Sequence, residues 1–333
     1  MELLKDVKVL ELGYFYPVPF CAKLLNYLGA EVIKIEPPSG DPSRLLGPIF
    51  AGFNYNKEII KLDLKKFEDR EVFYKLAKSS DVIIEGFRPG VVKRLGVDYE
   101  TIKKINPKII YCSISAFGQR TKLCGVPAHD INILGLAGIL EVSGFGELRD
   151  PNIQIADFSS SVYAALLIVA ALFDRKRTER GRYIDISMFH SAIFSIPLHS
   201  ISILNNLGIL PSFSSNPVYG IYETSDGYIT IGIVGEEHFW RRFCEALNLD
   251  LNTDLFESFK HYTEIRRMIK ERIKRMTTKE VLELMKKADV PVLEVLSLKE
   301  IEEIENRLGE KLVENIKFES KYAKVIKPPF KVY

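Results

Sequence analysis

The stretches VKVLEL at residues 7–12 and EVIKIE at residues 31–36 decide the fold class of this chain. Both are short and rich in aliphatic and β-branched residues, which is typical of strands buried on two faces. Residues 19–28 between them predict a helix that ends at Gly29, a natural C-terminal cap. The alternation continues with a helix over 69–79, a strand over 81–85, helices near 91–95 and 99–106, and a strand over 108–115. It predicts an α/β fold with a Rossmann-like parallel sheet covered by helices on both faces.

The remainder of the chain indicates a second, smaller domain. A polar loop after Gly118 leads to His129, a short helix is predicted over 131–138, and Asp157 opens a long apolar helix that ends in basic residues. A strand is predicted over 181–186, and Ser225-Asp226-Gly227 reads as a hairpin turn between two alternating strands. We therefore expect a large domain over 1–186, a linker arm over 187–216, a small α+β domain over 217–300, and a return to the large domain over 301–333.

Composition narrows the class of protein. The hydrophobic share of 47% and the charged share of 27% are typical of a soluble globular protein, and a net charge of +2 argues against nucleic-acid or membrane-surface binding. The four cysteines are scattered, which favours reduced thiols over a metal or disulfide framework. The longest apolar run, Val162 to Phe173, is shorter than the roughly 20 residues of a membrane span. The N-terminal stretch is acidic early, unlike a signal peptide, so a cytoplasmic protein is expected.

The loops after the predicted strands indicate what kind of ligand the sheet binds. The first one, LELGYFYPVPF, has no G-x-G-x-x-G pattern, which argues against a nicotinamide enzyme. The loop EGFRPG at residues 85–90 follows the third strand and is more promising, because Gly86 and Gly90 permit a tight turn while Arg88 and Arg94 can reach phosphates. The alternative interpretation of this loop is a surface turn with a solvated arginine.

A series of motifs spread along most of the chain resembles the superfamily of family III CoA-transferases and α-methylacyl-CoA racemases. The motifs are LELG at 10–13, LGAEVIKIEPP at 28–38, GD at 40–41, LDLK at 62–65, EGFRPG at 85–90, RLG at 94–96, NP at 106–107, FGQ at 117–119, HDIN at 129–132, ADF at 156–158 and, weakly, VPVL at 290–293. Val18 departs from the pattern by standing where relatives commonly have glycine, and Tyr55-Asn56 replaces the Arg-Gly usual before Lys57.

The resemblance implies that the ligand is an acyl-CoA thioester. Leu62, Asp63, Leu64 and Lys65 match a segment that contacts the adenine and ribose end of CoA in relatives. The match to the segment that grips the phosphates and pantetheine comprises Gly86, Phe87, Arg88, Pro89, Gly90, Val91 and Arg94, and Ala128 and Asp130 complete the expected contacts. No separate cofactor and no metal are expected. The resemblance also implies an interlocked homodimer, with the site between the large domain of one subunit and the small domain of its partner.

The racemases and the transferases of this superfamily differ at a few positions. Racemases pair the aspartate that matches Asp157 with a histidine that matches His129, whereas transferases use that aspartate as a nucleophile and generally lack the histidine. Transferases also tend to have a glycine-rich loop in the small domain, where residues 232–240 here read GIVGEEHFW. Both differences favour an α-methylacyl-CoA racemase, an isomerase of lipid metabolism, with Glu236 or the adjacent Glu237 orienting the histidine.

Three alternatives to the racemase remain open from the sequence. One is a CoA-transferase with Asp157 as its nucleophile, and another is a CoA-binding homologue that has lost turnover. The third gives the two residues ordinary structural roles, His129 as a satisfied polar residue and Asp157 as an N-cap worth about 1 kcal/mol.

Overall fold

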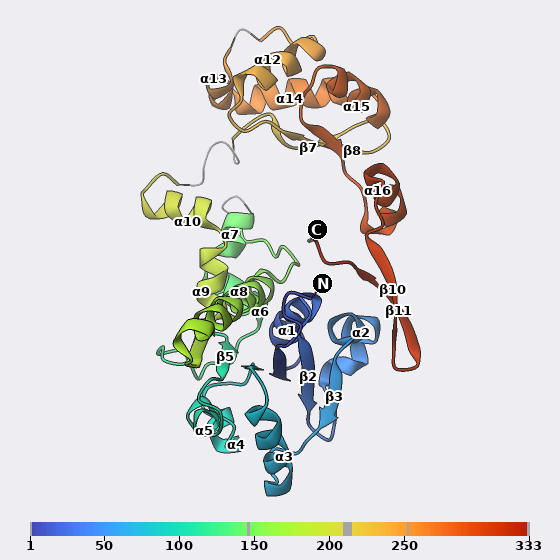
Figure 1. Ribbon diagram of the computed structural model, residues 1–333. Helices are drawn as coiled ribbons and strands as arrows, with labels where there is room; N and C mark the ends of the chain where they lie inside the picture. The colour runs from blue at the N-terminus through green and yellow to red at the C-terminus, as the bar shows by residue number, and fades with distance from the viewer. Residues whose placement is uncertain (1, 145–146, 209–214, 252, 332–333) are drawn as a thin grey trace. The chain divides into compact units, whose positions relative to one another are not determined.

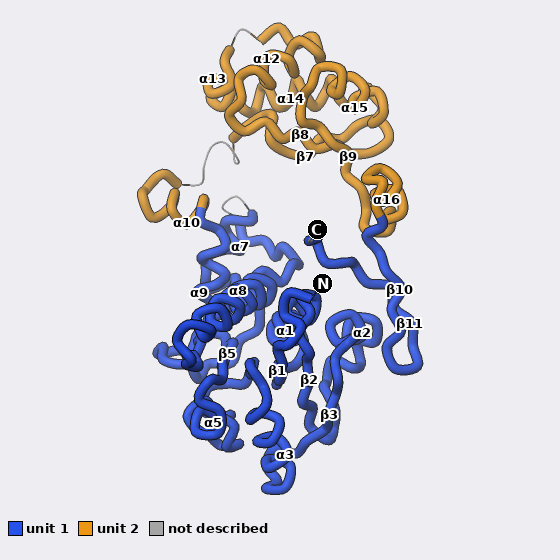
Figure 2. The backbone as a smooth tube through the Cα atoms, viewed as in Figure 1, with its two compact units in different colours: residues 1–197, 311–333 blue, residues 198–310 orange. Residues whose placement is uncertain are grey.

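The computed structural model describes residues 2–144, 147–208, 215–251 and 253–331 (Figure 1). The chain divides into two compact units, one made of residues 1–197 with 311–333 and the other of residues 198–310 (Figure 2). Within the arm expected over 187–216, residues 209–214 lie outside the described residues, as do residues 332–333 at the end of the expected C-terminal return.

The first unit is built on a six-stranded parallel sheet of order β3-β2-β1-β4-β5-β6, which confirms the predicted α/β class. Its strands are β1 (Lys8–Leu12), β2 (Glu31–Glu36), β3 (Glu58–Lys61), β4 (Val82–Glu85), β5 (Ile110–Ser115) and β6 (Arg182–Ser187). Strand β3 is not predicted, because its four residues EIIK begin and end with a charge and show no usable period.

Helices cover both faces of this sheet, and each face has its own apolar core. One core joins Val9, Ile84 and Cys112 of the strands to α1 (Pro17–Tyr27) and α8 (Ile155–Thr178). The other joins Leu10, Ile83 and Tyr111 to α3 (Phe67–Lys78) and α5 (Tyr99–Ile105), and α4 (Val91–Leu95) adds Val92. Burial on both faces explains why these strands are aliphatic at successive positions rather than at alternate ones.

Helix α8 is the central helix of the first unit. Among the described residues, α8 is the helix that is long and apolar enough to span a membrane. The apolar run over 162–173, which is shorter than a membrane span, is only the middle part of this helix. Here it packs as a core helix, with Ala164 and Ile168 buried against α1, α9 (Met188–Phe194) and β5. Basic residues in its last turn, Arg175 to Arg177, complement the helix dipole as expected.

The helix predicted over 131–138 is two short helices, α6 (Asp130–Leu136) and α7 (Ile139–Ser143). They are separated because Gly138 adopts φ +73°, a left-handed conformation that ends the first helix. The N-terminal half also contains the 3-10 helix η1 (Pro42–Leu46) and α2 (Pro48–Asn54).

Residues from the end of the chain complete the first unit as an antiparallel hairpin of β10 (Val313–Phe318) and β11 (Lys321–Ile326). Ile316 and Ala323 of the hairpin bury against Ala51 and Tyr55 of the α2 region. The Tyr55 hydroxyl donates a hydrogen bond to Glu314 Oε1 at 2.5 Å, which ties the hairpin to α2.

The second unit has an antiparallel sheet of β7 (Tyr219–Glu223), β8 (Tyr228–Gly232) and β9 (Val292–Glu294), in which the predicted hairpin joins the first two strands. Trp240, Tyr222 and Phe243 are buried in its core. Its helices are α10 (Pro197–Leu204, which begins at the last residue of the first unit), α12 (Glu237–Ala246), α13 (Leu255–Lys260), α14 (Tyr262–Ile273), α15 (Thr278–Lys287), the 3-10 helix η2 (Leu298–Glu300) and α16 (Ile301–Leu308).

Candidate active site

A cavity of about 390 Å³ opens at the carboxyl ends of β1, β4 and β5 in the first unit. Three loops and the end of β5 form most of its wall, and His129 and Asp157 both line it. The loop after β4 contributes residues 86–89, the loop after β1 contributes residues 12–15 with Pro17 and Val18, and the loop before α6 contributes Cys124, residues 126–128 and His129. Ligands of open α/β sheets bind at this edge, so the cavity is the candidate active site.

His129 precedes the first residue of α6, and its side chain is exposed. Its backbone N–H donates to Asn132 Oδ1 at 3.0 Å, which fixes the start of the helix. The motif HDIN therefore places the imidazole at the cavity wall and uses the asparagine three residues later to hold its backbone.

Asp157 is the third residue of α8, which begins at Ile155 after Gln154 as N-cap. The interpretation of Asp157 as the N-cap is therefore wrong. Asp130 satisfies the helix start instead, because its Oδ1 accepts the N–H groups of Ala156 at 2.7 Å and Asp157 at 3.0 Å. The side chain of Asp157 is thus free to line the cavity.

The pKa values of Asp157 and Asp130 are both raised above their usual range. Burial, followed by the nearby charge of Asp130, raises the pKa of Asp157 to about 7. Burial also raises the pKa of Asp130, although the two N–H groups that it accepts oppose this shift. Near neutral pH the Asp157 carboxyl is therefore available both protonated and ionised, as an acid–base group must be.

A buried ionic cluster holds the loop after β1 at both ends. Lys34 Nζ donates to Glu11 Oε1 at 2.8 Å and to the carbonyl oxygen of Gly13 at 2.6 Å. Lys57 Nζ donates to Glu11 Oε2 at 2.6 Å and to the carbonyl oxygen of Pro19 at 2.8 Å. Burial alone would raise the pKa of Glu11, but the two ammonium groups hold it below its usual value. The motifs containing these residues were recognised in the sequence, but their shared contact was not.

Val18 fills the space between the cavity loops after β1 and β4. A Cβ placed on Gly13 would lie 2.4 Å from the Val18 Cβ, and one placed on Gly86 would lie 2.8 Å from the Val18 Cγ2. Both glycines are therefore required by the close approach of the two cavity loops around this valine.

Several residues expected to contact CoA lie outside this cavity. Leu62 and Leu64 are buried in the core of the first unit, and Asp130 supports α8. Gly90 adopts φ +85° as the residue before α4, so that Val91 and Arg94 belong to that helix. Gly86, Phe87, Arg88, Pro89 and Ala128 do line the cavity, whereas Asp63, Lys65, Gly90, Val91 and Arg94 are not part of its wall.

Glu236 belongs to the second unit, where it is exposed and precedes α12. Its Oε2 accepts the N–H groups of Val234 and Gly235, both at 3.0 Å, and these bonds lower its pKa. Both oxygens of the adjacent Glu237 are engaged within the unit, one with Arg241 Nε and the other with the N–H of Leu255.

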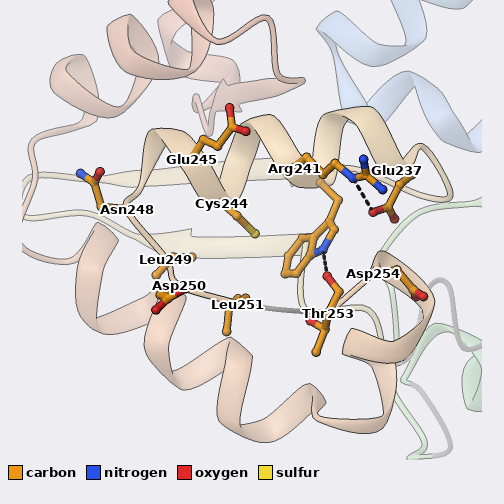
Figure 3. Close-up of a pocket in the computed structure, with 11 residues that line it drawn as sticks. Glu237, Arg241, Cys244, Glu245, Asn248, Leu249, Asp250, Leu251, Thr253 and Asp254 are labelled. Carbon is orange, nitrogen blue, oxygen red and sulfur yellow. Dashed lines mark hydrogen bonds and ion pairs between the residues drawn. The ribbon is translucent and has the colours of Figure 1, made fainter.

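A second hollow, of about 720 Å³, lies along α12 and the segment that follows it (Figure 3). Arg241 pairs there with Glu237, and the Trp240 indole N–H donates to the carbonyl oxygen of Thr253. Glu237 is the one residue named from the sequence that lines it, and its carboxylate is already used. The chemistry therefore points to the smaller cavity of the first unit.

Ser115 and Cys124 line the first cavity without having been named from the sequence. Ser115 ends β5 and is 7% exposed, and its hydroxyl oxygen has no hydrogen-bond partner among the residues that the structure describes. Its place at the end of a predicted strand, two residues before the FGQ motif, was the available signal, because the end of a central parallel strand faces the ligand.

The strand order, with a cavity at the ligand edge of the sheet that holds His129 and Asp157, defines a Rossmann-like α/β protein with a candidate active site. The chain matches CoA-transferase family III over residues 4–332, and it therefore belongs to that family. This confirms the superfamily that the motifs indicated, in which both transferases and racemases occur.

Named relatives fall on both sides of that division. The chain is 31% identical over 314 residues to the acetyl-CoA:oxalate CoA-transferase of Acetobacter aceti, which covers 88% of this chain and 80% of the relative. It is 33% identical over 258 residues to the alpha-methylacyl-CoA racemase of Homo sapiens, which covers 74% of this chain and 65% of the relative. The crystal structure of a CAIB/BAIF family protein from Brucella suis superposes with a TM-score of 0.85 at 25% identity, covering 98% of this chain and 91% of that one.

Proposed function

We propose that this enzyme racemises 2-methylacyl-CoA thioesters by moving a proton from one face of C2 to the other. The observation that carries the proposal is that His129 and Asp157 line one cavity. A carboxyl whose pKa is raised to about 7 can both donate and accept a proton near neutral pH, which a two-base reaction requires.

The proposed mechanism has two proton transfers. Neutral His129 removes the C2 proton, and the electron pair moves into the thioester carbonyl to give an enolate. Protonated Asp157 then delivers its proton to the opposite face of C2, which leaves a charged imidazole and an ionised carboxylate. The opposite enantiomer reacts through the same steps in reverse, and general acid–base help of this kind contributes roughly 10²–10⁴-fold per group.

The CoA portion of the substrate is assigned to the loops that the motifs indicate. Phe87 and Arg88 reach the cavity itself, so we place the pantetheine and a phosphate against them. The LDLK segment and Arg94 are proposed to contact the adenosine end, farther from the reacting carbon.

Glu236 is proposed to orient His129 across a homodimer, with the two residues supplied by different subunits. Val234 and Gly235 both donate to Oε2 of Glu236, so Oε1 is the oxygen that we propose for an imidazole N–H, while Glu237 has both oxygens engaged. An ionised carboxylate beside the ring would favour its charged form, which appears during each turnover.

A CoA-transferase is the second candidate, and the names of relatives such as the Acetobacter enzyme favour it. In that reaction the Asp157 carboxylate attacks the thioester carbonyl and expels CoA thiolate, forming an acyl anhydride on the enzyme. The thiolate then attacks the Asp157 carbonyl, releases the first acid and leaves an enzyme-bound CoA thioester. A second acid accepts the CoA by the same two steps in reverse.

One incubation separates the two candidates. A single enantiomer of 2-methyldecanoyl-CoA is placed in D2O without a free acid, and mass and chirality at C2 are followed. We expect deuterium at C2 with loss of optical purity, abolished in His129→Ala and in Asp157→Asn. CoA transfer to an added carboxylic acid without exchange at C2 would establish the transferase instead. Binding of acyl-CoA with neither reaction would indicate a homologue without turnover.

A further inference from the structure

Glu85 is a buried carboxyl that the proposed mechanism does not use. It ends β4, is 1% exposed, and its Oε2 accepts the backbone N–H of Phe87 at 2.8 Å. Ser113 lies beside it on the neighbouring strand, and its hydroxyl lowers the pKa of this carboxyl. Within the described residues, no lysine or arginine forms an ion pair with Glu85, so the Phe87 N–H and the neighbouring hydroxyl are the groups that favour its charged form.

The carboxyl belongs to a polar row that crosses three strands at the ligand edge of the sheet. Glu85 of β4 lies opposite Ser113 of β5, which lies opposite Asp185 of β6. The Tyr183 hydroxyl donates to Ser113 Oγ at 3.1 Å, and Asp185 accepts the N–H of Gln119 at 3.0 Å. A carboxylate at the end of β4 thus fastens the loop that follows its own strand, and a carboxylate within β6 fastens Gln119 in the loop after β5.

The loop fastened by Glu85 is the one that supplies Phe87 and Arg88 to the cavity. The Phe87 ring meets the Tyr14 ring edge to face, with centroids 6.1 Å apart. The hydrogen bond from the Phe87 N–H therefore fixes the backbone one residue before the arginine, and with it the direction in which the guanidinium can extend.

We propose that Glu85 is a positioning residue whose carboxylate holds residues 86–89 in the conformation that binds the pantetheine and phosphates of CoA. The inference deepens the proposed function and rests on CoA being the ligand. A hydrogen bond to an ionised acceptor is about twice as strong as one to a neutral acceptor, so the loop is held more firmly when Glu85 is charged.

Burial, with a contribution from Asp185, raises the pKa of Glu85 to about 7. The other titratable groups whose charges interact with it are Tyr111, Tyr183 and Cys112. If CoA binds the loop that ionised Glu85 holds, affinity must increase as the pH rises through about 7 and then reach a plateau.

The experiment measures binding of CoA itself by calorimetry from about pH 5.5 to about pH 8.5, a range that brackets the transition. For the unaltered enzyme we expect Kd to fall roughly tenfold across this range. Glu85→Gln keeps an acceptor for the Phe87 N–H but cannot ionise, so it should bind CoA with a smaller pH dependence. Glu85→Ala removes the acceptor and should bind roughly tenfold more weakly than the unaltered enzyme at the upper pH.

Asp185→Asn supplies a control that a general loss of structure would not mimic. It removes a charge that disfavours the ionised form of Glu85, so the midpoint of the pH dependence should move to lower pH. Circular dichroism of each variant checks that it is folded, and Glu85→Gln carries the test if Glu85→Ala is not.

The outcomes separate this inference from the proposed function. An unaltered enzyme that binds no CoA at any pH overturns both. An unaltered enzyme that binds CoA, while Glu85→Gln shows the same affinity and the same pH profile, overturns only the role of Glu85.

Discussion

At the scale of single residues, the chemistry of the cavity depends on how one carboxyl is placed. Asp157 lies in the first turn of its helix without capping it, because Asp130, from a different helix, accepts the first N–H groups. An aspartate that capped its own helix would have its oxygens occupied and its pKa lowered by the donated hydrogen bonds. Because Asp130 accepts those N–H groups instead, the Asp157 carboxyl stays partly buried, and its pKa of about 7 lies close to neutral pH.

A two-base racemase and a transferase predict different pH profiles from this carboxyl. The productive forms of the racemase, neutral His129 with protonated Asp157 and charged His129 with ionised Asp157, hold the same number of protons. We therefore expect a bell-shaped dependence of kcat/KM on pH that is identical for both enantiomers. The rise and the fall of this profile each reflect the protonation of the His129–Asp157 pair and not of one residue alone. A transferase needs only ionised Asp157, so its rate would rise once through about pH 7 and stay high. Initial rates for each enantiomer across pH check this.

The packing of Gly13 against Val18 gives a second prediction at this scale. Gly13→Ala introduces a Cβ at 2.4 Å from the Val18 Cβ, so we expect a loss of about 2 kcal/mol in the free energy of unfolding, with weaker CoA binding. Adding Val18→Gly makes room and should restore most of the CoA affinity. Gly125→Ala is the matched control, because its added Cβ would meet nothing within 4 Å. Urea unfolding and calorimetry measure both effects, and equal losses for Gly13→Ala and Gly125→Ala would contradict the steric explanation.

The sequence motifs were sufficient to predict that His129, Asp157 and residues 86–89 belong to one site, and all of them line the same cavity. They could not indicate that Asp130 would cap α8, because that bond joins two helices through tertiary packing rather than through local spacing. The contact of Lys34 and Lys57 with Glu11 was hidden for the same reason. A lysine inside a strand or before one is normally read as exposed, and only its neighbours in the folded sheet show otherwise.

At the scale of elements, the loop after β1 is held by charges that have no contact with water. Lys34, Lys57 and Glu11 have side chains that are 0% exposed. Removing one member of a buried ion pair leaves the other without compensation, which costs far more than losing a surface pair.

Lys57→Met tests this element directly. We expect the free energy of unfolding to fall by about 3 kcal/mol, because Glu11 loses one of its two cations and the Pro19 carbonyl loses its donor. Lys260→Met, which breaks an exposed pair with Glu257, should cost no more than about 0.5 kcal/mol. Denaturant titrations of both variants give the comparison. A Lys57→Met variant as stable as the Lys260→Met variant would show that the cluster does not hold the loop.

The sequence did not predict the strands that are short or exposed. Strands β1, β2, β4 and β5 were found because two-sided burial gives a continuous aliphatic signal. Strand β9 has three residues, and β10 and β11 carry charged and exposed side chains over a two-stranded hairpin. The hairpin is stabilised by its contact with α2, about 260 residues earlier in the chain, and no local pattern reports such a contact.

At the scale of the whole molecule, large apolar side chains remain uncovered on the first unit. Leu166 is 62% exposed, Phe173 is 78% exposed and Phe194 is 72% exposed, all on α8 and α9. An exposed apolar surface of this kind marks a site of protein association. It agrees with the homodimer that is part of the proposed function.

An interlocked dimer makes a prediction that an ordinary dimer does not. Sedimentation should give twice the chain mass at micromolar concentration. When tagged and untagged dimers are mixed, no mixed species should form until the protein is unfolded and refolded together, because threaded chains cannot separate while folded. Native mass spectrometry follows the exchange. A monomer would remove the proposed role of Glu236 in a partner's site, and rapid exchange would rule out the threaded form.

The closing hairpin of the first unit has a consequence for how the protein is made. Residues 311–331 complete a body whose other members all lie before residue 198, and the entire second unit is synthesised in between. At a synthesis rate of roughly 5–20 residues per second, the second unit takes about ten seconds to be made. During that time the hairpin does not yet cover the α2 surface of the first unit. The growing chain therefore passes through a stage in which chaperones have an apolar surface to recognise, and the second unit can fold before the first is finished.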